Sequence, residues 1–481
     1  MPFVTGPLPQ RLKLVHGFGA VAFGVKDSGF SFFLLPFYNL VLGVDASTVG
    51  AALAAALVID ALVDPLIGHL SDRTYTKWGR RLPWLYLAPW PLALVWTMLW
   101  SPPFTGTPGF WDIVALAVGV RLLLSACEVP SVSLVPEITD DYDDRTTLFR
   151  YRFLSGWLGG LLMMVLTFTV FLPTPQSQLQ PEGYASYGLF GAALIALSVI
   201  GSAAAQHRIV AQLPERRPPP FSITGAFAEI FDAFREKAFV IFALGGLAAY
   251  VLQGMTFSIT QYVNLYVWQF SELAFQLYPA VLFLSVVLMF VIVGPLHRRW
   301  GKPKSAALGA LVGLAFYCSP YVFYLAGAWP TVGTTASTAL LYGFLVCANT
   351  ASVVAIISAT SMVAEIVEAF EERTGQRAEG TFYAGNWLVQ KCATGGGIPL
   401  TSLIVPSIDL APGTPQAEVA PETVRQLVWL FMLAATVLAS IAAFWLARFP
   451  ISREQHEARV AARRGRPAPP APATADPLDQ A

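Results

Sequence analysis

The sequence predicts an all-α membrane protein in which twelve transmembrane helices form two six-helix halves. Three observations predict this fold: a low content of charge, long apolar runs and an internal repeat. Of the 481 residues, 55% are hydrophobic and only 12% are charged, about half of the ~25% that is usual in soluble domains. The 30 basic and 30 acidic residues cancel, so we expect no basic nucleic-acid surface and no nucleic-acid partner.

The apolar residues gather in runs that are long enough to be transmembrane helices, which need roughly 20 apolar residues to cross the hydrocarbon layer. A transmembrane barrel would instead show short segments of alternating polarity. The runs cover residues 14–42, 48–71, 82–101, 111–137, 150–172, 186–206, 238–268, 273–296, 305–328, 332–362, 381–406 and 424–447.

The basic residues predict the orientation of these helices, because cytoplasmic connections are enriched in Lys and Arg. If the N-terminus is cytoplasmic, 26 of the 30 basic residues fall in inside segments and the outside connections hold none. Arg11 and Lys13 precede a long helix rather than a short cleavable signal. We therefore expect a multi-pass protein of the plasma (inner) membrane, surrounded by the lipid bilayer, with both termini cytoplasmic.

The chain also repeats itself. Residues 133–146 read SLVPEITDDYDDRT and residues 361–374 read SMVAEIVEAFEERT, and a weaker echo links 68–80 with 294–302. The repeat predicts an N-terminal half at 1–206 and a C-terminal half at 238–450, with the same orientation in the membrane. We also expect a linker at 207–237 with an interfacial helix at 222–236, and a disordered cytoplasmic tail at 451–481.

Parallel six-helix halves are the design of the major facilitator fold, and the motifs are consistent with it. GHLSDRTYTKWGRR at 68–81 resembles the loop motif between its second and third helices. With DALVDPLIG at 60–68, KD at 26–27 and EVPSVSLVP at 128–136, the chain resembles the glycoside–pentoside–hexuronide:cation symporter family over all twelve helices. This resemblance implies a sugar or glycoside substrate moved with H⁺ or Na⁺, and no other cofactor.

Two acids on the second predicted helix are the candidate coupling-cation site. Asp60 and Asp64 are four residues apart and so share one helix face. Two carboxylates repel each other unless a cation or proton lies between them; the alternative is a structural tie to a basic residue. The resemblance places the cation, including a metal ion if it is Na⁺, at Asp60, Asp64 and Ser125. The family pattern has an asparagine where this chain has Val63, and losing that amide oxygen favours H⁺ over Na⁺.

The candidate substrate site contains five charged side chains. The resemblance implies that Asp27 and Glu128 accept hydrogen bonds from sugar hydroxyls and that Arg152 donates to them, with Lys26 and Lys391 beside them. Carboxylates and a guanidinium fork suit a polyol. The alternative is a charge network that locks the N-terminal helices. We expect Lys391 to reach across to Asp60 or Asp64 when the cation leaves.

Two further features leave the substrate open. The family pattern has a stacking tryptophan where this chain has Val132. Another aromatic residue can take its place, for example Tyr151, Trp157, Tyr383 or Trp387, although packing or anchoring at the membrane interface is the more common role of such residues. The missing tryptophan and the 33 phenylalanines also fit a lysolipid or another amphiphile. Arg121 either screens an acidic substrate or pairs with an acid.

A set of charges at the predicted cytoplasmic ends of the helices is duplicated between the halves. We expect it to form a gate of salt bridges between the halves that closes in the outward-open state. Its members are Asp72, Arg73, Arg80, Arg81, Glu137, Arg145, Glu365 and Arg373.

The sequence does not predict an enzyme. It has no GxxxxGK[ST] phosphate loop, and its 5 histidines show neither HxxH nor HExxH spacing. We expect a functional monomer that transports a small molecule by alternating access.

Overall fold

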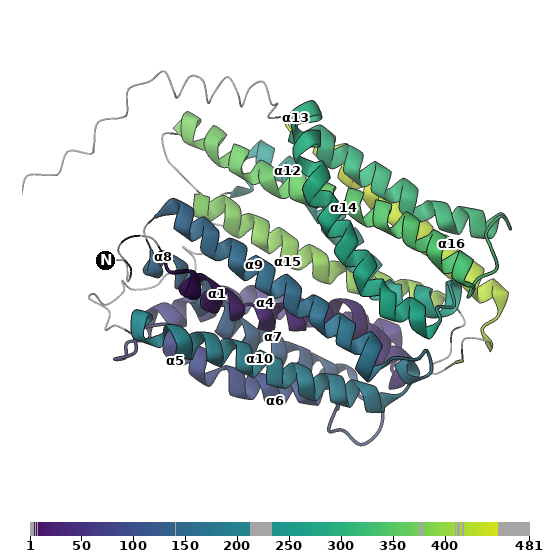
Figure 1. The fold of residues 1–481 in the computed structure, drawn as a ribbon, viewed down its shortest axis with the longest axis horizontal. Helices are drawn as coiled ribbons and strands as arrows, with labels where there is room; N and C mark the ends of the chain where they lie inside the picture. The colour runs from purple at the N-terminus through teal and green to yellow at the C-terminus, as the bar shows by residue number, and fades with distance from the viewer. Residues whose placement is uncertain are drawn as a thin grey trace, which may run out of the picture.

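The computed structural model describes Val4, Gly6, 8–139, 141–211, 233–374, 379–408, Leu410, 414–415 and 418–450. Within these ranges the regular elements are helices, as expected, apart from one isolated β-bridge between Thr76 and Gly79 (Figure 1). The predicted interfacial helix falls largely on 212–232, and the predicted disordered tail on 451–481, both outside the described residues.

The first six predicted spans correspond to helices. The first is a series of helical pieces: α1 (Gln10–Phe18), α2 (Val21–Ser28), the π-helices η1 (Gly29–Phe33) and η2 (Phe37–Val41), and α3 (Leu34–Pro36) between them. The others are α4 (Ala46–Arg73), α5 (Leu82–Leu87) with α6 (Pro89–Trp100), α7 (Phe110–Ser133) with α8 (Val135–Ile138), α9 (Tyr142–Leu166) with η3 (Thr167–Phe171), and α10 (Pro181–Val210), preceded by η4 (Ser177–Leu179).

The second six spans also correspond to helices. They are α12 (Lys237–Tyr262) with η5 (Val263–Val267), α13 (Glu272–Leu325), α14 (Thr335–Thr374), α15 (Glu379–Ile404) with η6 (Val405–Ser407), and α16 (Pro421–Ala447).

The helix α13 covers two predicted spans in 54 residues. If it were straight, at 1.5 Å per residue, it would be roughly 80 Å long, far more than one crossing of the ~30 Å hydrocarbon layer. It bends back at Gly301, whose φ of +74° and ψ of 168° are accessible to glycine and strained for other residues. The chain therefore makes two crossings here.

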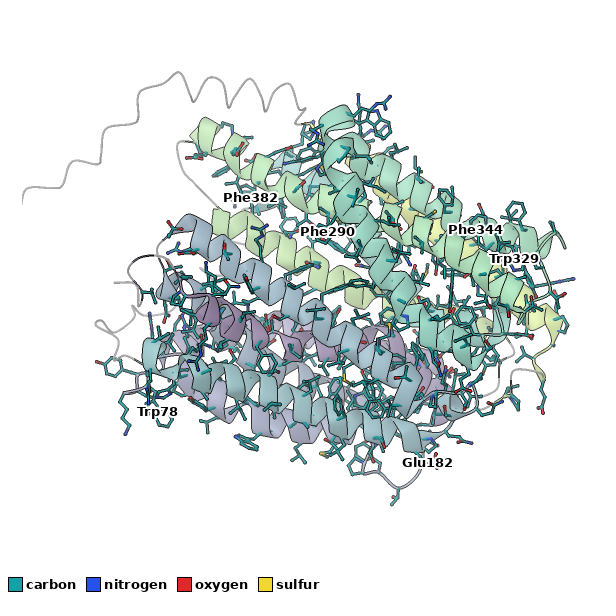
Figure 2. All side chains as sticks on the ribbon, viewed as in Figure 1. Trp78, Glu182, Phe290, Trp329, Phe344 and Phe382 are labelled. Carbon is teal, nitrogen blue, oxygen red and sulfur yellow. The ribbon has the colours of Figure 1, made fainter. Side chains whose placement is uncertain are left out.

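Two groups of helices lie side by side (Figure 1). In the first group α4 packs on α7, α2 on α9 and α6 on α10; in the second, α13 packs on α14 and α12 on both α15 and α16. The two groups meet mainly where α4 lies against α15 and where η1 lies against α12. Trp78 and Glu182 mark opposite ends of the bundle (Figure 2), here called the Trp78 end and the Glu182 end.

The close packing of α2 on α9 depends on glycine. A Cβ atom added to Gly24 would lie 1.7 Å from the carbonyl oxygen of Gly156, and one added to Gly159 would lie 2.9 Å from that of Val21. These two helices carry the candidate substrate residues Asp27 and Arg152, so the glycines set the distance between the elements that hold the site.

Candidate functional site

Asp60 lies in the interior of the helix bundle and has a basic partner. Its Oδ2 is 3.2 Å from Nη1 of Arg121, and its Oδ1 accepts a hydrogen bond of 3.3 Å from the hydroxyl of Ser125. Arg121 and Ser125 are one turn apart on α7, so both face α4. The guanidinium of Arg121 also lies 5.1 Å from the ring centroid of Phe30. The Asp60 and Arg121 side chains are only 5% and 9% exposed.

Asp64 lies one turn further along α4 and contacts the other group of helices. Nζ of Lys391, on α15, donates a hydrogen bond to Asp64 Oδ2 and lies 3.9 Å from Asp60 Oδ2. The structure therefore brings together four residues of the predicted cation region: Asp60, Asp64, Ser125 and Lys391. Lys391 contacts both acids at once.

Glu128 and Arg152 form a second pair, between α7 and α9. Nη2 of Arg152 donates to Glu128 Oε1 at 2.6 Å, and Nη1 donates to the hydroxyl of Ser131 at 2.6 Å. The Arg152 side chain is 5% exposed and that of Glu128 is 29% exposed. The arginine is thus fixed by two bonds, while the carboxylate keeps access to the space beside it.

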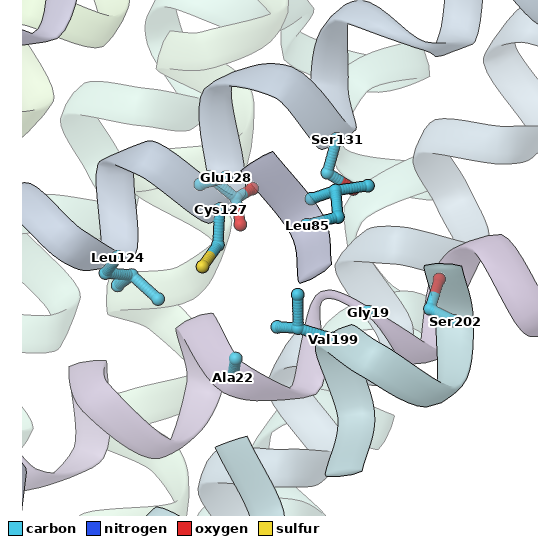
Figure 3. Close-up of a pocket in the computed structure, with 9 residues that line it drawn as sticks. All are labelled: Gly19, Ala22, Leu85, Leu124, Cys127, Glu128, Ser131, Val199 and Ser202. Carbon is cyan, nitrogen blue, oxygen red and sulfur yellow. The ribbon is translucent and has the colours of Figure 1, made fainter. Parts of the chain in front are cut away.

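Glu128 lines a small pocket within the first group of helices (Figure 3). The pocket has room for about one water molecule, so it does not hold a sugar in this conformation. It is enclosed by α7, α10, α5 and the start of the first span, through Gly19, Ala22, Leu85, Leu124, Cys127, Glu128, Ser131, Val199 and Ser202.

Lys26 and Asp27 form a third pair at 3.7 Å. Nζ of Lys26 also lies 4.7 Å from the ring centroid of Phe23. Lys26 is close enough to Arg121, Asp60 and Lys391 to interact with them electrostatically, so it belongs to the same group of charges. Asp27 pairs with Lys26 rather than joining Arg152 and Glu128, and its side chain is 48% exposed.

The four acids of this region therefore have four basic partners: Lys26 for Asp27, Arg121 for Asp60, Lys391 for Asp64 and Arg152 for Glu128. Ionisable groups at membrane depth are costly and are tolerated mainly when paired. Across the described ranges, no three His, Cys, Asp or Glu side chains gather as a metal-binding group. The arrangement suits binding of hydroxyls and exchange of charge partners.

Six of the eight charges expected to form a gate lie in ion pairs within each group of helices. Arg81 contacts Asp72 and, at 3.1 Å, Glu137, while Arg80 lies 3.2 Å from Glu137. In the second group, Lys302 is 2.9 Å from Glu365 and Arg373 contacts Glu236. Nε of Arg145 donates to the Thr139 carbonyl, and Arg73 lies in the last turn of α4. A bridge from one half to the other stays a prediction for the outward-open state.

At the Glu182 end, by contrast, polar contacts join the two groups. The hydroxyl of Tyr262 donates to Asn39 Oδ1 at 2.9 Å, and Gln261 bonds to Gln178. Nearby, the rings of Phe32 and Phe257 stack with centroids 4.5 Å apart. The two groups of helices are thus in contact at this end.

The aromatic residues considered as replacements for a stacking tryptophan have other contacts. Trp157 lies against Phe283 of α13, with ring centroids 5.7 Å apart, and the Tyr151 hydroxyl accepts a hydrogen bond from Gln10. Tyr383 and Trp387 have side chains outside the described residues. For Tyr151 and Trp157, the two whose side chains are described, these contacts are with residues other than Glu128.

Two residues of the site have roles that sequence reasoning left open or missed. The sequence left two roles for Arg121, contact with an acidic substrate or an ion pair with an acidic side chain, and the structure pairs it with Asp60. Ser131, which holds Arg152, was not singled out. The spacing contained a signal for Arg121: it lies four residues before Ser125, so a hydroxyl that faces Asp60 brings Arg121 to the same face.

Comparisons with known proteins are consistent with this architecture. A family model described as "MFS/sugar transport protein" matches residues 15–453. An uncharacterised symporter of Synechocystis is 27% identical over 92% of this chain and 94% of its own length. A glucuronide carrier protein homolog of Escherichia coli is 25% identical over 82% of this chain and 83% of its own.

The fold itself is similar to that of solved transporters. A mutant of the nucleoside transporter NupG superposes with a TM-score of 0.64 at 14% sequence identity, covering 92% of this chain and 99% of the other. The chain is therefore a multi-pass membrane transporter, not an enzyme, and it belongs to the MFS/sugar transport family of major facilitators, among the glycoside–cation symporters.

Proposed function

We propose that the protein is a secondary-active symporter that moves a sugar or glycoside-type solute together with a cation, H⁺ or Na⁺. The halves 1–206 and 238–450 rock about a central site, which opens to one side of the membrane at a time. The observation that carries the proposal is the contact of Lys391 with both Asp64 and Asp60. A cation that arrives at these acids competes with Lys391 and so alters the contact between α4 and α15.

In this proposal the solute is bound by Asp27, Glu128 and Arg152, with Lys26 and Lys391 at the edge of the site. The support is geometric: Arg152 is held by Ser131 and by Glu128, whose carboxylate is partly exposed. A sugar hydroxyl accepts from the guanidinium and donates to the carboxylate, so one polyol satisfies both groups. Because the described pocket holds only about one water molecule, the site must widen when the substrate binds.

The expected orientation and gate complete the proposal. Both termini lie in the cytoplasm of a cell whose plasma (inner) membrane holds the protein, and one monomer performs the cycle. The Trp78 end then faces the cytoplasm. The intra-half pairs of Arg81 and Lys302 exchange for bridges between the halves when that end closes.

A thermal-shift screen of purified protein tests this proposal. Neutral sugars, glycosides, glucuronides and lysolipids are each added in Na⁺ buffer and in choline buffer, at two pH values. We expect a sugar or glycoside to raise the Tm of the wild type and not that of Glu128→Gln, because bound ligand stabilises the folded state by mass action. Stabilisation by lysolipids alone would contradict the sugar assignment and identify an amphiphile as the substrate.

A further inference from the structure

Arg121 lies where a coupling metal ion would have to bind to Asp60. Its Nη1 is 3.2 Å from Asp60 Oδ2. Ser125 donates to Oδ1, and Nζ of Lys391 is 3.9 Å from Oδ2. Both oxygens of the carboxylate therefore already face donors, and two of those donors carry a positive charge.

The side chains around Asp60 fit a metal ion poorly. A hard cation needs several oxygen ligands. The Asp60 carboxylate has only the hydroxyl of Ser125 bonded to it as a further oxygen, and the neighbouring Asp64 carboxylate is held by the ammonium of Lys391. Val63, next to Asp64 on α4, is apolar and packs beside the hydrophobic core. Any metal ion bound to Asp60 would also lie within a few ångströms of the guanidinium, in an interior where like charges repel strongly.

The guanidinium is held in place. Arg121 is 9% exposed at the side chain, and Phe30 covers it with a ring-centroid distance of 5.1 Å. Burial and the face of the Phe30 ring keep the guanidinium beside Asp60. An arginine also keeps its positive charge at any physiological pH, so this ion pair is permanent. Arg121 thus differs from Lys391, whose side chain is 33% exposed and contacts two acids.

We propose that Arg121 is a tethered cation that takes the place of a metal ion at Asp60, so that transport by this chain is independent of Na⁺. This inference rests on the proposed symport and decides between its two candidate ions, leaving the proton. Asp60 then contributes to coupling by holding the Arg121 guanidinium and α7 beside Asp64, and the ion that these acids exchange is a proton.

The test measures Na⁺ binding without any solute. The Tm of the purified full chain is recorded in NaCl and in choline chloride of the same ionic strength, for the wild type, Arg121→Gln and Arg121→Lys. We expect no Na⁺-specific shift for the wild type or for Arg121→Lys. Arg121→Gln removes the charge and supplies an amide oxygen, so we expect Na⁺ to raise its Tm by a few degrees. That gain should disappear when Asp60→Asn is added.

A Na⁺-specific stabilisation of the wild type would overturn the proposal. A folded Arg121→Gln variant that ignores Na⁺ would overturn it as well, because Arg121 would then not be what excludes the metal. If Arg121→Gln cannot be purified, equilibrium dialysis of the wild type against radioactive sodium decides, with specific binding as the contradicting result. Because no solute is present, the result stands even if the proposed sugar substrate proves wrong.

Discussion

Lys391 of α15 donates a hydrogen bond to Asp64 of α4, across 327 positions of the chain. The same ammonium lies 3.9 Å from Asp60, so one side chain from the second group of helices contacts two acids of the first. This contact connects the charge state of α4 to the packing of α4 against α15.

Removing the charge of Lys391 should loosen that packing. Lys391→Gln leaves Asp64 beside Asp60 without its own counter-ion, and we expect the free energy of unfolding to fall by roughly 1–3 kcal/mol, since the lysine is partly exposed. The loss should shrink when Asp64→Asn is combined with it, as a double-mutant cycle in thermal unfolding would show. Lys237→Gln, at an exposed lysine that begins α12, is the matched control. Additive effects of the two changes would argue against a direct coupling.

The pair Glu128–Arg152 should be needed for binding the solute. We expect Glu128→Gln and Arg152→Ala to weaken the affinity for the identified substrate at least about tenfold, because each removes a charge-assisted hydrogen bond worth roughly 1.5–3 kcal/mol. Coupling-cation binding should remain. Isothermal calorimetry measures both, with Arg448→Ala, an exposed arginine at the end of α16, as the control. Unchanged affinity in both variants would move the substrate site elsewhere.

The close packing of α2 on α9 leaves no room for a side chain at Gly24. A Cβ there would lie 1.7 Å from the Gly156 carbonyl oxygen, so Gly24→Ala must push the helices apart and should cost about 1–3 kcal/mol. Gly343→Ala on α14 is the control, since a Cβ at that position meets nothing within 4 Å. Thermal unfolding compares the two, and equal Tm values would contradict the packing described here.

The hydrogen bond from Tyr262 to Asn39 should stabilise the conformation in which the Glu182 end is closed. Tyr262→Phe leaves the buried Asn39 oxygen without this donor, at a cost of about 1–3 kcal/mol to the closed end. We expect the population to move towards conformations in which that end is open. Distances between spin labels placed on the 101–109 and 326–334 connections report the shift, and an unchanged distance distribution would show that the bond does not hold this end.

The positions of the helices follow from the apolar runs, because each run must satisfy its backbone polar groups internally to cross a bilayer. The structure differs from these predicted helices at two places where the local backbone geometry, and not hydropathy, sets the shape of the helix. The two spans at 273–296 and 305–328 are continuous in α13 except at Gly301, and the first span contains the π-helical turns η1 and η2. The apolar runs do not predict the bend at Gly301 or the π-helical turns, because neither feature changes the hydropathy of the sequence.

The candidate site was predictable as a set of charges but not as a set of pairs. Asp60 and Asp64 share a face by spacing alone, whereas the partner of each acid depends on which faces of α4, α7 and α15 meet. Arg121 is the informative case. Its spacing from Ser125 places it near Asp60, but whether it faces an acid or a solute depends on the helix rotation that packing sets.

The central claim, that Asp60 and Asp64 couple a cation to solute movement, is tested most directly by concentrative uptake into proteoliposomes under an imposed proton gradient. Wild type, Asp60→Asn and Asp64→Asn are compared, with exchange of solute at equilibrium as the check that each variant still folds and binds. We predict that the wild type concentrates the solute and that both variants lose concentrative uptake while both retain exchange. Concentrative uptake that survives both substitutions would contradict the assignment.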